Sequence, residues 1–339
     1  MSPSPHDRLF RTVFQHLEHA RGWLASRLPG ELMGFVPWEL LQRRPEHLPV
    51  PGRSGYAADL VFALPLPGAR APLLLLVEHK SHRDHSTAEQ LLRYAVLLRR
   101  AERTRENRHP ALVLALVLHH GPEPFAEPAH PQLDALPPRL AAFLAPRQPR
   151  LVHLLDDLTT TDEASLRARA MTPMATLTLL ALRSFPGSAG HTVPAAIARR
   201  GDLLRAVDRS SGTLSAADAL AAFACYVVEV TDVLLGDLDL AFADHLHVHK
   251  ETTMTTAERL RAEGRAKGLR EGHREGHREG LATGRNEGRA AVLRLQLEQR
   301  FGLLPSAVVA RLGEATATEL ERFAVRVLDA RTLTDVFEG

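Results

Sequence analysis

Three charged residues stand where two apolar runs of this chain begin or end, at a spacing suited to chemistry on phosphate esters. Asp59 directly precedes one apolar run, and Glu78 and Lys80 directly follow another. Two carboxylates a few ångströms apart repel each other, and a hard divalent cation such as Mg²⁺ relieves that repulsion. A lysine beside them can stabilise an attacking water or the charge that develops on phosphate oxygens. The trio predicts metal-assisted phosphodiester hydrolysis; the alternative is a surface ion-pair cluster at two strand ends.

Two strands must position this trio. The runs Leu60–Leu64 and Leu73–Val77 are short and apolar, and a segment rich in proline and glycine separates them. Short apolar runs bounded by such residues are typical of buried strands. If the two strands pair as an antiparallel hairpin, Asp59 lies beside the C-terminal end of the second strand, where Glu78 is. Because side chains alternate along a strand, Glu78 and Lys80 then point to the same face.

The remaining elements of the first half predict an α/β core around this hairpin. Apolar periodicity of 3.6 indicates helices, continuous apolar runs indicate buried strands, and Ser86-Thr87-Ala88-Glu89 resembles a capping box. A proline-rich loop precedes the hairpin. In chain order we expect a helix from His6 to Leu28, a short helical piece near Trp38 to Gln42, the hairpin, a helix from Ser86 or Thr87 to about Arg105, a strand from Ala111 to Leu118, parallel to the second hairpin strand, and another from Leu151 to Leu155.

Composition excludes several classes of protein. The 339 residues are 45% hydrophobic and 24% charged, with a formal net charge of +2, so any nucleic-acid surface must be local. The single cysteine, Cys225, rules out an internal disulfide framework and fits a reducing cytoplasm. We expect no signal peptide at the N-terminus. The longest apolar region, Ala216 to Leu235, carries three acids and predicts a buried helix, not a membrane span.

The second half is mostly helical from about Ser165 to His247, and then glycine recurs at every fourth position from Gly264 to Gly288. Each glycine costs a helix roughly 1 kcal/mol relative to alanine. Close approach of a second helix along the glycine groove would compensate, so we expect self-association as a helix pair with a right-handed crossing. The alternative is a flexible, charged linker. Arg289 to Gly339 predicts a small helical interaction or capping module with a helix stop at Phe301-Gly302.

Five ordered motifs give the chain a resemblance to the recombination-promoting nuclease family, whose members are also described as transposases of the PD-(D/E)xK nuclease superfamily. The likeness is close from about Pro5 to His120 and fades through the helical region. The glycine repeat and the C-terminal unit also resemble what such proteins carry. The motifs are His6-Asp7-Arg8-Leu9-Phe10-Arg11, Leu28-Pro29, Ala58-Asp59-Leu60, Val77-Glu78-His79-Lys80-Ser81 and Gln90-Leu91-Leu92-Arg93-Tyr94.

The resemblance implies a restriction-endonuclease-like fold and a Mg²⁺-dependent DNA endonuclease, with Mn²⁺ as a substitute metal. It makes Asp59 and Glu78 the metal ligands, together with the backbone carbonyl of His79, and gives Lys80 the role of assisting the water. Many members have glutamine where this chain has Lys80.

The resemblance also assigns residues around that centre. Gln90 and Arg93 would lie near the site, contacting phosphate or orienting Glu78. Asp7 would supply a further acid or, in keeping with its position, cap the first helix. The His119-His120-Gly121 segment would end the third strand in a structural or a catalytic role.

Three functional hypotheses follow: a dimeric metal-dependent DNA nuclease that promotes recombination or mobile-element movement, a catalytically silent DNA- or protein-binding member of the same fold, and a transposase with strand-transfer activity. The expected division is a nuclease-like core over residues 1–160, a helical extension over 161–250, the glycine-repeat helix or linker over 251–290 and a small helical domain over 291–339.

Overall fold

The computed structural model describes residues 4–50, 53–82, 84, 86–102, 110–125, 136–147 and 151–337. The chain separates into two compact units, Met1–Arg261 and Ala262–Gly339. The four-part division expected from the sequence stays a prediction.

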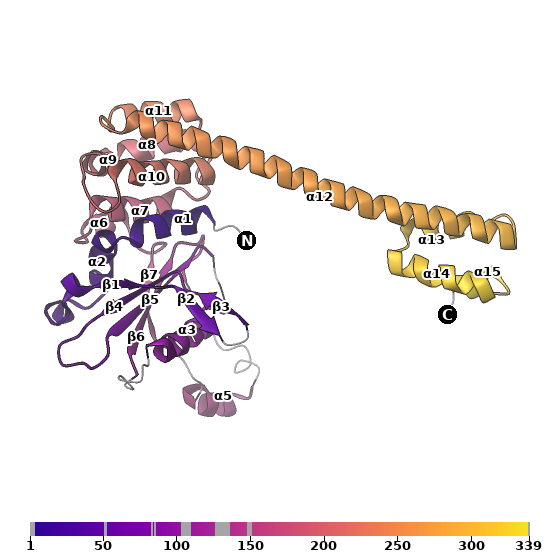
Figure 1. The fold of residues 1–339 in the computed structure, drawn as a ribbon, viewed down its shortest axis with the longest axis horizontal. Helices are drawn as coiled ribbons and strands as arrows, with labels where there is room; N and C mark the ends of the chain where they lie inside the picture. The colour runs from indigo at the N-terminus through magenta and orange to yellow at the C-terminus, as the bar shows by residue number, and fades with distance from the viewer. Residues whose placement is uncertain are drawn as a thin grey trace. The chain divides into compact units, whose positions relative to one another are not determined.

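A five-stranded mixed sheet forms the centre of the first unit (Figure 1). Its order is β1 (Gln42–Arg44), β4 (Leu60–Leu64), β5 (Leu73–Lys80), β6 (Leu112–His119) and β7 (His153–Asp157). The pairs β1·β4 and β4·β5 are antiparallel, and β5·β6 and β6·β7 are parallel. The predicted hairpin, the strand parallel to it and the further strand are therefore all confirmed, and the fold class is α/β as expected.

The two faces of the sheet pack against different helices. Phe62 and Val77 belong to the apolar cluster that contains helix α1 (Pro5–Phe14), whereas Val61 and Leu76 belong to the cluster that contains α3 (Thr87–Ala101). Successive residues thus enter opposite clusters, because side chains alternate across a strand. With apolar contacts on both faces, β4 and the middle of β5 are buried.

The helix expected from His6 to Leu28 is two helices, α1 and α2 (Leu17–Ala25). His16 between them has extended backbone angles and begins α2. The break turns the chain so that Trp23 packs against both Phe10 and Phe14, with ring centroids 5.7 and 4.7 Å apart. Tertiary aromatic packing therefore overrides the continuous helical periodicity.

Between α2 and β4 the chain holds more strand than the sequence predicted. Two short 3₁₀ turns, η1 (Gly30–Phe35) and η2 (Trp38–Leu40), precede β1. The segment expected to be a loop instead contains β2 (His47–Val50) and β3 (Arg53–Ala57), which form a separate two-stranded antiparallel sheet. Its register shifts between Leu48 and Val50, around Pro49. Proline is tolerated at such irregular strand positions, so it is a poor signal for a loop there.

Helix α3 begins near the expected place by a different contact. Ser86 precedes it with helical backbone angles and makes no side-chain cap. Asp84 instead accepts hydrogen bonds from the amide and hydroxyl of Ser86, and its backbone carbonyl accepts from the Thr87 hydroxyl. The expected capping box is therefore wrong, and Glu89 pairs with Arg93 instead. Residues 103–109, where this helix was expected to end, lie outside the described part of the chain.

The helical region follows the sheet as predicted, with breaks at Pro186-Gly187 and near Gly212. Helices α7 and α10 are its most buried members, and both pack against α1.

Buried Asp156 on β7 joins this region to the sheet. Its carboxylate accepts hydrogen bonds from Trp23 Nε1 at 2.8 Å and from both terminal nitrogens of Arg169 at 2.8 and 2.9 Å. The elements after β6 are α5 (Pro138–Leu144), η3 (Ala145–Arg147), α6 (Glu163–Arg167), α7 (Pro173–Ser184), η4 (Gly190–Thr192), α8 (Val193–Ala198), α9 (Gly201–Asp208), α10 (Ala216–Val230) and α11 (Leu235–Ala243).

A 52-residue helix, α12 (Lys250–Phe301), carries the glycine repeat. It ends at the predicted stop, where Gly302 has a φ of +83° that favours glycine. Three helices follow, α13 (Ser306–Glu314), α14 (Ala317–Asp329) and α15 (Leu333–Phe337). They pack on the end of α12 around a small core that includes Leu297 and Phe323, as expected for a helical C-terminal unit.

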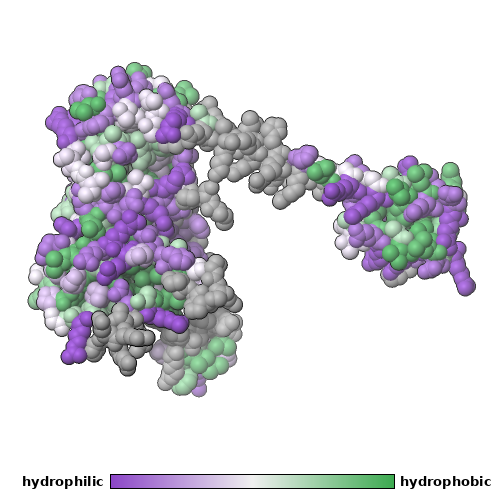
Figure 2. Space-filling model, in the orientation of Figure 1, coloured by the Kyte–Doolittle hydropathy of each residue, from purple (hydrophilic) through white to green (hydrophobic). Residues whose placement is uncertain are grey.

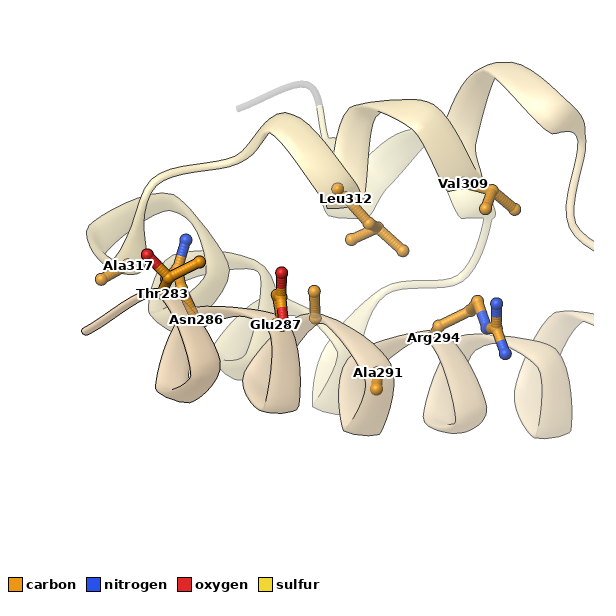
Figure 3. A pocket seen from close by; sticks show the side chains of 10 residues that line it. Thr283, Asn286, Glu287, Ala291, Arg294, Val309, Leu312 and Ala317 are labelled. Carbon is orange, nitrogen blue, oxygen red and sulfur yellow. The ribbon is translucent and has the colours of Figure 1, made fainter. Parts of the chain in front are cut away.

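The C-terminal unit exposes apolar side chains on its surface (Figure 2). A groove of about 680 Å³ runs between α12 and α13, with Asn286 and Arg294 on one side and Val309 and Leu312 on the other (Figure 3). The groove contains none of the residues that the sequence singled out for chemistry. Within the described residues, no helix is both long and apolar enough to cross a membrane.

Candidate active site

The register of the β4·β5 hairpin brings Asp59 and Glu78 together. Leu60 pairs with Val77, so the next residues outward, Asp59 and Glu78, face each other across the two strands. The Asp59 amide lies 3.4 Å from Glu78 Oε1, and the His79 amide donates to Asp59 Oδ2 at 2.8 Å. The two carboxylates therefore meet at the carboxyl end of β5, where the hairpin interpretation expects them.

Glu78 is a buried acid beside a second acid. Its residue is 3% exposed, and burial, followed by the charge of Asp59, raises its pKa to about 8, against the opposing effects of Lys80 and Arg11. Without a cation between them, two such carboxylates are hard to keep ionised together. A divalent cation would remove this penalty, because its charge favours both ionised forms.

Lys80 lies on the same face of β5 as Glu78, and Gln90 of α3 connects them. Gln90 Nε2 donates to Glu78 Oε2 at 3.1 Å, while Lys80 Nζ donates to Gln90 Oε1 at 2.7 Å. Lys80 also donates to Asp84 Oδ2 at 2.9 Å. Although burial opposes it, this hydrogen bond and those from Ser86 lower the pKa of Asp84 to about 2. The lysine ammonium is therefore held in place by two acceptors.

His79 points to the opposite face of β5. Its ring is fully buried and stacks between Phe10, at a centroid distance of 4.9 Å, and His120, at 4.8 Å. Burial, followed by the charge of His79, lowers the pKa of His120 to about 2, so its ring is neutral. Only the backbone of His79 remains to face the acid pair, which is what a carbonyl ligand at this residue requires. His120 takes a packing position.

Asp7 lies on the His79 side of the sheet and uses both carboxylate oxygens there. Oδ2 accepts from Ser4 in the capping box that opens α1, which confirms the expected capping role. Oδ1 lies 2.9 Å from His79 Nδ1. Although burial opposes it, the hydrogen bonds from His79 and Ser4 hold the pKa of Asp7 well below its usual range. Asp7 therefore supports the His79 ring, and its contacts do not bring it to the acid pair.

Arg11, one turn beyond Asp7 on α1, reaches the metal-ligand candidate itself. Its guanidinium donates to Asp59 Oδ1 at 3.1 Å and to the Ala58 carbonyl at 2.9 Å. Sequence reasoning assigned no role to Arg11 or to Asp84. Arg11 lies in the first family-like motif, four residues after Asp7. Residues four apart on a helix lie on the same face, so this spacing could have predicted that both side chains point to the sheet.

The structure does not bring Arg93 to the acid pair. Its guanidinium pairs with Glu89 at 2.8 Å and lies 5.1 Å from the centroid of the Tyr56 ring. The two helix residues singled out by the sequence thus separate: Gln90 faces Glu78 and Lys80, and Arg93 faces the β2·β3 sheet.

The donor set fits a hard cation with oxygen ligands. Among the described residues there is no group of three His, Cys, Asp or Glu side chains arranged to hold a metal ion. Mg²⁺ needs fewer protein ligands, since it is commonly bound by one or two carboxylates and keeps several waters. Asp59, Glu78 and the His79 carbonyl satisfy that requirement, whereas a structural zinc site needs four nitrogen or sulfur ligands.

Comparison with known proteins places the chain in a family. The family model described as "Putative transposase, YhgA-like" matches residues 4–189, which include every residue of the candidate site. This match confirms the resemblance seen in the sequence motifs. No solved structure matches the chain.

Three relatives from Escherichia coli (strain K12) show how far the likeness extends. Recombination-promoting nuclease RpnA is 25% identical over 273 residues, 78% of this chain and 85% of that protein. Recombination-promoting nuclease RpnC is 24% identical over 120 residues, 35% of this chain and 40% of that protein. Inactive recombination-promoting nuclease-like protein RpnE is 25% identical over 118 residues, with the same coverage of 35% and 40%. The match to RpnC and RpnE thus covers less than half of either protein.

Proposed function

The chain belongs to the YhgA-like transposase family, and on that premise we propose that it is a metal-dependent DNA endonuclease that promotes recombination or mobile-element movement. The observation that carries the proposal is the Asp59–Glu78 pair, with Glu78 buried and its pKa raised to about 8 beside a second carboxylate. A hard divalent cation takes ligands of this kind, and its charge would favour the ionised form of both acids.

In this proposal Asp59, Glu78 and the His79 carbonyl hold Mg²⁺, or Mn²⁺ in its place. The cation supplies charge neutralisation for the scissile phosphate and lowers the pKa of a water. Lys80, held by Asp84 and Gln90, directs its ammonium to the same face as Glu78 and stabilises negative charge on the attacking oxygen. Gln90 orients Glu78, and Asp7 supports the His79 ring on the other side of the sheet.

A catalytically silent role is the second candidate. One relative, RpnE, is named as inactive, and it matches this chain at about the same identity and over the same share as RpnC, which is named a nuclease. The internal pairing of Asp59 with Arg11 and of Lys80 with Asp84 would serve a silent fold equally well. Strand transfer, which the family description suggests, would use the same metal site and differs only in the attacking group.

We propose that the protein acts as a homodimer through the glycine repeat of α12, in the cytoplasm. The helical backbone of α12 is the conformation that a paired-helix interface needs. The single cysteine, Cys225, fits a reducing compartment.

The test is cleavage of supercoiled plasmid by the purified full-length protein in Mg²⁺, in Mn²⁺ and in EDTA. The wild type is expected to nick or linearise the plasmid only with metal, and Glu78→Gln to lose at least about 100-fold of that rate, because it removes a ligand charge. Glu89→Gln, a change of the same size at an exposed position on α3, is the matched control and should cut at the wild-type rate.

Three outcomes decide between the candidates. Metal-dependent cutting that Glu78→Gln abolishes supports the nuclease. DNA binding without cleavage in either metal would reject it in favour of the silent module. Cleavage that survives Glu78→Gln would remove the acid pair from the mechanism.

A further inference from the structure

Arg11 is the one cation of helix α1 that contacts the acid pair in the described structure. It lies four residues after Asp7, so these two side chains share one helix face, and both of them and Phe10 reach the β4–β5 end of the sheet. Asp7 and Phe10 contact the His79 ring, whereas Arg11 contacts Asp59 directly. Nothing in the proposed reaction yet uses this residue.

The two carboxylate oxygens of Asp59 have different partners, one a backbone amide and the other a charged side chain. Oδ2 accepts the His79 amide at 2.8 Å, and Oδ1 accepts the Arg11 guanidinium at 3.1 Å. The guanidinium is further fixed by the Ala58 carbonyl at 2.9 Å, so it is held at this place by two acceptors from one strand end. Its charge therefore offsets one of the two negative charges that would attract a metal ion.

We propose that Arg11 is a positioning residue that acts through Asp59, as a resident counter-ion that sets how tightly the Asp59–Glu78 pair binds a divalent cation. The inference rests on the proposed function and deepens it, because it concerns regulation of the same site. Arg11 holds the Asp59 carboxylate in place while no cation is bound and weakens the binding of the cation that arrives.

The sign of the effect follows from charge. Affinity for a hard cation rises with the charge of its ligand set, and Arg11 reduces that charge from two negatives to one. A bound divalent cation would also repel the guanidinium a few ångströms away. Loss of Arg11 does not release Asp59, because the His79 amide still holds its other oxygen. Removing the positive charge should therefore strengthen metal binding.

The experiment titrates Mn²⁺ alone into the metal-free full-length protein and measures free Mn²⁺ by electron paramagnetic resonance. Arg11→Met, which keeps the length of the side chain without its charge, should bind Mn²⁺ about tenfold more tightly than the wild type. Arg11→Lys should restore wild-type affinity. Arg8→Met is the matched control, since Arg8 lies on the same helix and pairs with Glu229, away from Asp59.

The outcomes separate this inference from the proposed function. If Arg11→Met binds Mn²⁺ no more tightly than the wild type, and Glu78→Gln still loses binding, the counter-ion role is wrong and the metal site stands. If the wild type binds no Mn²⁺, or binds it independently of Glu78, both fall. If circular dichroism shows that the Arg11→Met variant is unfolded, the same titration is made with Arg11→Gln.

Discussion

At the scale of single residues, Gln90 connects the two parts of the site that carry opposite charge. Its amide nitrogen contacts the buried Glu78 carboxylate and its oxygen accepts from Lys80. The same nitrogen also lies 3.1 Å from the Tyr94 hydroxyl, which anchors Gln90 to its own helix. One neutral side chain thus fixes the orientation of both groups.

Gln90→Leu should therefore slow metal-dependent cleavage by about 10- to 100-fold, since Glu78 and Lys80 each lose an orienting partner. The chain should stay folded, because Leu91 and Leu98 stay buried in the apolar cluster between α3 and the sheet. Initial rates of plasmid cleavage at saturating Mg²⁺ measure the effect. Arg93→Leu, one turn further along the same helix, is the control and should stay within about twofold of the wild-type rate. Equal losses in both variants would mean that α3 acts by packing alone.

The sequence predicted Asp59, Glu78 and Lys80 as a group because side chains alternate along a strand, and this alternation can be read from neighbouring residues alone. A hairpin register then brings the first acid to the second without any knowledge of the rest of the fold. Arg11 and Asp84 could not be predicted in this way. Their contacts depend on how α1 docks against β4 and on the path of the chain after β5, and neither follows from residue spacing.

At the scale of elements, the start of α12 depends on one buried carboxylate. Asp208, at the end of α9, accepts backbone N–H bonds from His247, Val248 and His249 at 2.9, 3.0 and 3.0 Å. These three residues directly precede α12, so a carboxylate from a distant segment fixes the chain that leads into the helix. Burial opposes these bonds, but they lower the pKa of Asp208.

Asp208→Asn should lower the free energy of unfolding by about 2 kcal/mol at pH 7, because the amide offers one acceptor in place of a charged pair. The folded pKa lies below the unfolded value of about 3.9, so the stabilisation is complete above pH 4 and is lost as the pH falls through the folded pKa. The gap between wild type and variant should therefore be full at pH 7 and smaller at pH 3.

Urea unfolding followed by circular dichroism at both pH values measures this gap. Asp244→Asn, at an exposed position after α11, is the control and should change stability by less than about 0.5 kcal/mol at either pH. A gap that stays constant between pH 7 and pH 3 would mean that the charge of Asp208 contributes nothing.

The sequence predicted the hairpin, the parallel strand and the helical region, because each has a long and uniform apolar pattern. It missed β2 and β3, since Pro49 lies at an irregular point of their ladder. It joined α1 to α2, because His16 interrupts the backbone without interrupting the apolar period. Short irregular strands and packing-driven breaks are where local patterns carry least information.

At the scale of the whole molecule, the proposed homodimer rests on the glycines of α12. A Cβ built at Gly280, Gly284 or Gly288 meets no atom of the described residues within 4 Å. Glycine is thus not required there by contacts within the described chain, although each one weakens the helix by roughly 1 kcal/mol relative to alanine. Close approach of another helix would explain why small residues occupy these positions.

Replacing these three glycines by leucine should raise the helicity of the protein and reduce its self-association. A Cβ at these positions has room within the described chain, whereas leucine side chains would separate two paired helices. Light scattering over a range of concentrations measures the mass, and circular dichroism measures the helicity. Arg285→Leu, at a neighbouring exposed position, should leave the mass as it is in the wild type. If the triple variant keeps the wild-type mass, the interface lies elsewhere.

The hairpin register has a consequence for how this family can change length. The loop of residues 65–72 joins β4 to β5 outside the paired residues, so insertions or deletions there leave Asp59 opposite Glu78. One residue added within Leu60–Leu64 or Leu73–Val77 would instead move one acid to the other face of the sheet. Natural variants should therefore differ freely in loop length while keeping the two strands free of gaps.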